Sequence, residues 1–265
     1  MTPWGEFYDL CMGRGLSPKT TAIYTGVVRR LAVWCDQHGY DTATVPPHAV
    51  RTWADQLPAS HSSRKQAVAA CRMLWAGRTD APWDAIRVPR KPRPDPQPLD
   101  TDELVRLLAA ADLVGGRAGM AVHILCFTGA RPSEVAGMMW DGYNGQTLAW
   151  WRSKTSEEHR LPVHPRLRAV LDVYRRASGP MFAGDRGRPH VTPTTVAGWV
   201  RRVGATVDVD VTPRRLRASV ATRILDETGS LEAAAAVLGH RSTDTTRRYT
   251  RTSDRRLEAA ILALG

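Results

Sequence analysis

Residues 125–140 read LCFTGARPSEVAGMMW and carry the clearest structural signal in this sequence. The apolar residues at the start predict a helix that ends at Thr128-Gly129, because glycine readily takes the backbone conformation that closes a helix. Arg131 then opens the next helix, and Glu134 follows one turn later. An arginine at such a turn is ordinary by itself, so its meaning depends on what accompanies it elsewhere in the chain.

A second cluster lies further along, where residues 211–225 read VTPRRLRASVATRIL. The hydroxyl of Thr212, followed by Pro213, predicts the start of a helix. Arg214 and Arg217 are three residues apart, so the helix places them on one face.

The third cluster, residues 238–251, reads LGHRSTDTTRRYTR, with His240 after a glycine and Tyr249 nine residues later. Together with Arg131 and Arg217, these residues match, in order, the signature of the tyrosine recombinases, so the chain resembles the phage integrase family. The resemblance covers the whole C-terminal half. Any one piece would be weak evidence, whereas the ordered set is very specific.

The resemblance implies a mainly α fold with a small antiparallel β-sheet: an all-helical core-binding domain and a tyrosine-recombinase catalytic domain. We expect the DNA-binding, core-binding domain at residues 1–86, a proline-rich basic linker at 87–99, and the catalytic domain with a C-terminal helix at 100–265. The first domain carries no comparable signature of its own. Residues 1–16 are too short for the arm-binding domain of many phage integrases, which favours the simple two-domain type.

The residue types suit cleavage of a phosphodiester. Attack on the phosphate develops negative charge on its nonbridging oxygens, which the guanidiniums of Arg131 and Arg217 can bind while always staying charged. His240 can add a hydrogen bond. Tyr249, with an ordinary pKa near about 10, is a poor nucleophile until it is positioned and deprotonated. The resemblance implies a 3′-phosphotyrosine at Tyr249 and a free 5′-hydroxyl, with no nucleotide cofactor and no metal.

The leaving 5′-oxygen needs a proton, which the resemblance assigns to a lysine on a β-hairpin. Lys154, within SKTSEEHRLPVH at residues 153–164, resembles that lysine. The chain contains 33 Arg and 4 Lys, so a random basic position would be arginine about nine times in ten. Lysine can give up a proton near neutral pH and arginine cannot. The alternative is an ordinary surface lysine on a hairpin.

Arg214 departs from the family pattern, which usually has histidine and sometimes lysine at this position. Arginine can bind phosphate but cannot act as a base. Our hypothesis is that Arg214 keeps the electrostatic role, while water, a phosphate oxygen or His240 takes the proton from Tyr249. The alternative is that Arg214 marks a weakened enzyme.

The helices expected around these motifs follow from caps, prolines and apolar spacing. In the catalytic domain, a helix begins at Asp100 or Thr101, another covers about 119–127, and strands TLAWW and HRLPVH flank a hairpin tip. The final segment SDRRLEAAILALG is amphipathic. The resemblance implies that it packs on a neighbouring protomer, and packing on its own domain is the alternative. Three helices are predicted in the first domain: one from Ser17-Pro18, one after Pro46-Pro47 and one over about Ser62–Trp75.

The linker reads RVPRKPRPDPQPL, and its alternating prolines predict an extended segment. At about 3.1 Å per residue it reaches roughly 40 Å, more than the width of a DNA duplex. Two domains could therefore embrace opposite faces of DNA. Arg90, Lys91 and Arg93 make the linker basic, which fits either DNA contacts or a solvated hinge.

Charge and composition point to a nucleic-acid partner. The net charge is +11 and the pI about 10.1, and both halves are basic, with 13 basic and 8 acidic residues in 1–98 and 24 and 18 in 99–265. No long apolar run predicts a membrane span, and no secretory signal is evident. The four scattered cysteines indicate reduced thiols in a cytoplasmic protein.

Other candidate side chains fit the chemistry less well. Tyr143 and Tyr174 lack the glycine-histidine frame that precedes Tyr249. The remaining histidines, His123 and His159 among them, show no ligand-like spacing and are expected on the surface or satisfied in the core.

The function that the resemblance implies is site-specific recombination by a tetramer on two double-stranded DNA sites through a Holliday junction, with accessory DNA-bending or directionality factors as possible partners. A type IB topoisomerase uses the same chemistry without site choice. A non-catalytic DNA-binding regulator on the same fold is the alternative from another class. Target sequence and biological setting are not readable from the residues.

Overall fold

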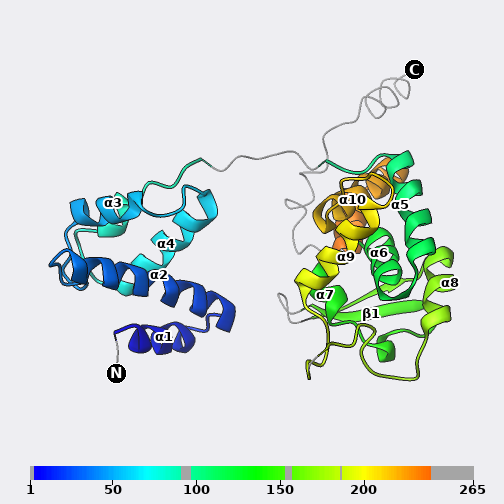
Figure 1. Ribbon diagram of the computed structural model, residues 1–265, viewed down its shortest axis with the longest axis horizontal. Helices are drawn as coiled ribbons and strands as arrows, with labels where there is room; N and C mark the ends of the chain where they lie inside the picture. The colour runs from blue at the N-terminus through cyan, green and yellow to red at the C-terminus, as the bar shows by residue number, and fades with distance from the viewer. Residues whose placement is uncertain (1–2, 91–96, 153–156, 186, 240–265) are drawn as a thin grey trace, which may run out of the picture. The chain divides into compact units, whose positions relative to one another are not determined.

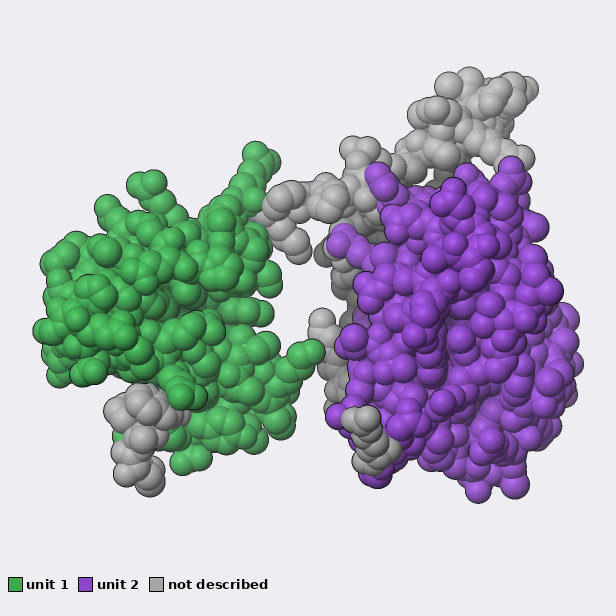
Figure 2. All heavy atoms as spheres, in the orientation of Figure 1, with its two compact units in different colours: residues 1–93 green, residues 94–265 purple. Residues whose placement is uncertain are grey.

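The computed structural model describes residues 3–90, 97–152, 157–185 and 187–239. It divides into two compact units, residues 1–93 and 94–265 (Figure 2). The described part is mainly helical with one two-stranded antiparallel sheet (Figure 1), which confirms the predicted fold class. No described helix has the length and apolar character needed to cross a membrane.

Unit 1 is built from helices alone. The three predicted helices are present, and side chains of Ser17 and Ser60 accept hydrogen bonds from the backbone at the starts of two of them. An additional helix precedes them and contributes Phe7 and Cys11 to the core, a packing that its short apolar pattern did not predict. The helices are α1 (Pro3–Gly13), α2 (Pro18–Gln37), α3 (Pro47–Asp55), α4 (His61–Leu74) and the 3₁₀ turn η1 (Pro82–Ala85).

Unit 2 is organised around α6 (Gly116–Thr128). This helix packs against α5 (Thr101–Val114), α8 (Pro165–Tyr174), α9 (Pro193–Ala205) and α10 (Pro213–Thr228). Residues on nearly every side of α6 are buried, as expected for a central helix. α5 (Thr101–Val114) starts with a capping box between Asp100 and Glu103. Gly129 ends α6 with a φ of 61°, and α7 (Pro132–Ala136) follows at once.

The sheet is a hairpin of β1 (Thr147–Arg152) and β2 (Glu157–Pro162), in which Trp150 pairs with His159 and Arg152 with Glu157. The predicted strands are therefore present. The remaining elements are the 3₁₀ turn η2 (Trp140–Gly142), α8 (Pro165–Tyr174), α9 (Pro193–Ala205), α10 (Pro213–Thr228) and α11 (Leu231–Leu238). Thr212 caps α10 as its sequence predicted.

Both ends of the proline-rich segment are anchored to their own units. On one side, His61 bonds the Pro89 carbonyl at 2.8 Å. On the other, the backbone N–H of Leu99 donates to Ser219 Oγ at 2.7 Å, and Arg215 Nε donates to the Gln97 carbonyl at 3.1 Å. Residues 91–96 between them lie outside the described part.

Candidate active site

Arg217, on α10, joins two motif segments that are far apart in the sequence. Its Nη1 donates to the carbonyl of Gly129 and its Nη2 donates to the carbonyl of Leu238 at 2.7 Å. Gly129 stands two residues before Arg131, so the structure places Arg217 beside the turn that carries the first motif arginine. The ordered motif residues Arg131 and Arg217 are thus in neighbouring segments of one site.

Arg131 is held by Glu134 at two points. Its backbone N–H donates to Glu134 Oε2 at 2.8 Å, and its Nη1 donates to Glu134 Oε1 at 2.6 Å. The Arg131 side chain keeps a third of its surface exposed, while Glu134 is buried. Glu134 therefore fixes the direction of the Arg131 guanidinium, and the exposed part of the side chain remains open to a ligand.

Arg152, the last residue of β1, is a member of the site that sequence reasoning missed. It is buried, and its Nε lies 3.4 Å from Glu134 Oε1. Its guanidinium also occupies the space where a Cβ at Gly239 would stand. The available signal was strand alternation, because Trp151 faces solvent and Arg152 then points inward.

The carboxyl group of Glu134 stays ionised in this setting. Burial by itself raises its pKa, but hydrogen bonds from Arg131 and the charges of Arg131 and Arg152 outweigh burial, so the pKa lies below its ordinary value. In these contacts one carboxylate faces two guanidiniums, those of Arg131 and Arg152. The positive balance suits an anion such as a phosphate.

His159, on β2, reaches the same region. Its Nε2 lies 3.0 Å from the carbonyl of Val237 on α11, and its ring meets Trp150 edge-on at 4.8 Å between centroids. Burial lowers its pKa, the Arg152 and Arg217 charges lower it further, and the Val237 bond and Glu134 oppose them, with a net lowering. The prediction of a satisfied histidine is correct for this residue, but its place in the site was not foreseen.

Arg214 is exposed on α10, one turn before Arg217, and makes no hydrogen bond or ion pair with the described residues. Its side chain is therefore available to a ligand. Lys154, His240 and Tyr249 lie outside the described residues, as do Lys91 and Arg93 of the linker, while Arg90 is an exposed residue of unit 1.

The described tyrosines of unit 2 are already engaged. Tyr143 donates its hydroxyl to Asp172 at 2.7 Å, and burial followed by that contact raises its pKa to about 12. The hydroxyl of Tyr174 accepts a bond from Gly116 N–H at 2.6 Å. The raised pKa makes Tyr143 a poor nucleophile. Within the described part of the chain, no group of three or more His, Cys, Asp or Glu residues could hold a metal ion.

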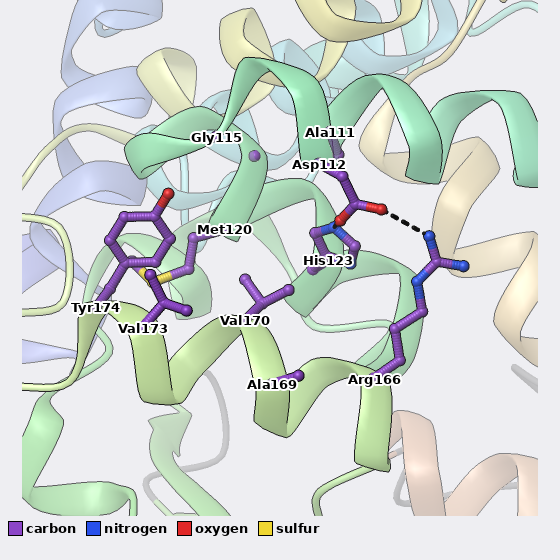
Figure 3. A pocket seen from close by; sticks show the side chains of 11 residues that line it. Ala111, Asp112, Gly115, Met120, His123, Arg166, Ala169, Val170, Val173 and Tyr174 are labelled. Carbon is purple, nitrogen blue, oxygen red and sulfur yellow. Dashed lines mark hydrogen bonds and ion pairs between the residues drawn. The ribbon is translucent and has the colours of Figure 1, made fainter.

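A separate cavity of about 410 Å³ lies between α5, α6 and α8 (Figure 3). Asp112 stands at its rim between His123, whose Nε2 is 2.7 Å away, and Arg166, whose Nη2 is 2.8 Å away. None of its lining residues belongs to the cluster around Glu134, so the cavity is distinct from the candidate active site.

The sequence of this chain matches that of a known family and of individual recombinases. The profile of the phage integrase family matches residues 97–256. The tyrosine recombinase XerC of Xanthomonas axonopodis pv. citri (strain 306) is 29% identical over 271 residues, covering 89% of this chain and 87% of the relative. The tyrosine recombinase XerA of Thermococcus kodakarensis is 28% identical over 265 residues, covering 96% and 92%.

Solved structures share the fold. The integrase of transposon Tn1549 in complex with transposon right end DNA aligns with a TM-score of 0.73 at 16% identity, covering 100% of this chain and 99% of that one. The XerH recombinase bound to difH substrate aligns with a TM-score of 0.71 at 16% sequence identity, covering 97% of this chain and 84% of that one. The lambda integrase tetramer bound to a Holliday junction aligns with a TM-score of 0.63 at 18% sequence identity, covering 91% of this chain and 77% of that one.

Proposed function

Because this chain belongs to the phage integrase family, we propose that it is a site-specific DNA recombinase that cleaves and rejoins DNA through a 3′-phosphotyrosine. The observation that carries the proposal is the position of Arg217, which bonds the carbonyls of Gly129 and Leu238. One carbonyl lies two residues before Arg131, and the other two residues before His240. One side chain thus ties three motif segments together, which supports a single site for them.

In this proposal Arg131 and Arg217 bind the nonbridging oxygens of the scissile phosphate. Two fixed guanidiniums stabilise the charge that develops there during attack, without having to reorganise at the moment of reaction. Glu134 acts on the phosphate only through Arg131, by fixing the direction of its guanidinium. The electrostatic stabilisation that a metal ion supplies in other phosphoryl-transfer enzymes comes here from arginine.

The covalent step belongs to residues outside the described part of the chain. Tyr249 attacks the phosphorus and the bond to the 5′-oxygen breaks, giving a 3′-phosphotyrosine and a 5′-hydroxyl. Lys154 gives its proton to the leaving oxygen, and His240 donates a hydrogen bond to the phosphate. The phosphodiester energy is retained in the tyrosyl ester, so rejoining needs no nucleotide cofactor.

Arg214 contributes charge to the phosphate and no proton transfer, since arginine stays protonated at any working pH. Its exposed side chain, which pairs with no other described residue, lies one turn from Arg217 and fits that role. The proton of Tyr249 then passes to water, to a phosphate oxygen or to His240.

The proposed partner is double-stranded DNA with two recombination sites, held by a tetramer of this chain. Relatives with the same fold support this: XerH is bound to difH substrate, and a lambda integrase tetramer is bound to a Holliday junction. Unit 1 and the basic residues Arg90, Lys91 and Arg93 would contact the DNA backbone, where positive charge adds affinity without sequence choice.

Nicked suicide substrates carrying candidate attachment sites test the function. The wild-type chain should form a covalent protein–DNA adduct, and Tyr249→Phe should form none while binding the same DNA. Absence of any adduct with sites that the chain binds tightly would favour a DNA-binding regulator. Relaxation of arbitrary supercoiled plasmid by the monomer would favour a type IB topoisomerase.

A further inference from the structure

Three side chains from other elements meet the last three residues before His240. His159 bonds the Val237 carbonyl at 3.0 Å, and Arg217 bonds the Leu238 carbonyl at 2.7 Å. Arg152 fills the space beside the Cα of Gly239. Two of the three side chains, those of His159 and Arg152, come from the β1–β2 hairpin.

These contacts complete the C-terminus of α11. The last carbonyls of a helix have no partner within the helix and need one from outside. The N–H of Gly239 serves the carbonyls of Ala235 and Ala236. His159 and Arg217 serve the next two carbonyls, and donors at this end also suit the negative pole of the helix. The hairpin and α10 therefore supply the hydrogen-bond donors that the last carbonyls of α11 need.

The hairpin and α11 lead directly into two residues of the proposed chemistry. Lys154 follows Arg152 by two residues, and His240 follows Gly239 immediately. We propose that His159 is a positioning residue of the proposed reaction, because it fixes the hairpin strand that follows Lys154 in the sequence to the helix end that precedes His240. This inference rests on the proposed function and deepens it.

Histidine suits the task because one ring carries both a donor and a packing face. Its Nε2–H donates to Val237 while its ring packs edge-on against Trp150. Glutamine can place an amide N–H near the same point, and phenylalanine keeps the ring without a donor. The pair His159→Gln and His159→Phe therefore separates the hydrogen bond from the packing.

Single-turnover cleavage of a suicide substrate at saturating DNA is the test. We expect His159→Phe to lower the cleavage rate constant about tenfold, the value of one hydrogen bond expressed in the transition state, with unchanged DNA affinity by fluorescence anisotropy. His159→Gln should recover most of the rate. His190→Phe is the matched control, because it removes a bond to the Val191 carbonyl elsewhere in unit 2, and its rate should equal that of the wild type.

A second readout does not depend on activity. Hydrogen exchange of the α11 amides, read by mass spectrometry, should speed up in His159→Phe and return toward wild type in His159→Gln. If His159→Phe cleaved DNA and exchanged its α11 amides at the wild-type rates, the inference would be overturned. An equal loss of cleavage rate in both His159 variants would also overturn it. Failure of the wild-type chain to form an adduct would defeat the proposed function instead, and the exchange readout would still decide whether His159 holds α11.

Discussion

Glu134 accepts hydrogen bonds from both the backbone N–H and the guanidinium of Arg131, at 2.8 and 2.6 Å. The same carboxylate lies 3.4 Å from the Nε of the buried Arg152. One acidic side chain thus fixes an arginine that is open to solvent and neutralises one that is not. Glu134 therefore both positions the Arg131 guanidinium and stabilises the fold around Arg152.

Replacing Glu134 should therefore affect both properties. Glu134→Ala leaves Arg152 as a buried charge that lacks this partner, and we expect a loss of about 3 kcal/mol in the free energy of unfolding. Glu134→Gln retains acceptor and shape but loses the charge, so it should cost less stability. Urea unfolding measures the difference. Equal stability of Glu134→Ala and wild type would show that the pair with Arg152 contributes nothing.

Arg217→Lys should reduce cleavage by about a hundredfold, comparable to the loss of one oxyanion donor. A single ammonium cannot span two carbonyls and a phosphate as a planar guanidinium can. The measurement is single-turnover cleavage, with DNA affinity checked separately. Arg223→Lys, an exposed position further along α10, is the control and should cleave normally. A normal rate for Arg217→Lys would remove Arg217 from the site.

Gly239→Ala should disturb the site through a direct collision, because the added Cβ would strike the Arg152 guanidinium. Gly229 offers a matched control: its φ of 66° resembles the 59° of Gly239, but no atom lies within 4 Å of its added Cβ. Both changes carry the backbone strain of a left-handed residue, about 1 kcal/mol. We expect Gly239→Ala to lose more stability and at least tenfold in cleavage rate, whereas Gly229→Ala should cleave normally. Indistinguishable variants would contradict the contact.

Arg214→His should leave cleavage unchanged or improve it. Histidine can exchange a proton near neutral pH, which arginine cannot, and the exposed position on α10 leaves room for either ring tautomer. Single-turnover rates between pH 6 and 8, a window of about one unit on either side of neutrality that brackets the histidine pKa, would reveal any added titration. Complete loss of activity in Arg214→His would refute a purely electrostatic role for Arg214.

The lowered pKa of His123 predicts how the free energy of unfolding depends on pH. Burial lowers its pKa and the nearby Arg166 adds to this, while Asp112 raises it, with a net lowering below the ordinary value of about 6.5. Between the folded and unfolded pKa values the unfolded chain binds more protons, so stability falls as the pH drops through about 6.5 toward the folded pKa. Urea unfolding of His123→Asn should show a shallower fall over that range. An identical slope in the variant would place the titration elsewhere.

Much of the fold follows from local chemistry. Thr212 and Pro213 begin α10, Gly129 ends α6, and the strand-like stretch TLAWW forms β1, since caps and short apolar runs act over a few residues. The helix α1 escaped prediction because its stability comes from packing Phe7 and Cys11 against the rest of unit 1, and its own pattern is too short to indicate this.

The sequence alone predicts the chemical set: Arg131, Arg217, His240 and Tyr249 in this order, and a lysine, Lys154, in an arginine-rich chain. Tertiary structure alone decided that Arg152 lies beside Glu134 and that His159 lies beside the end of α11. Arg152 meets a carboxylate 18 positions away, and His159 bonds a carbonyl 78 positions away. Strand alternation indicates only that Arg152 points inward, and no local pattern marks His159. Their partners are known only from the tertiary structure, because folding brings together residues that are far apart in the sequence.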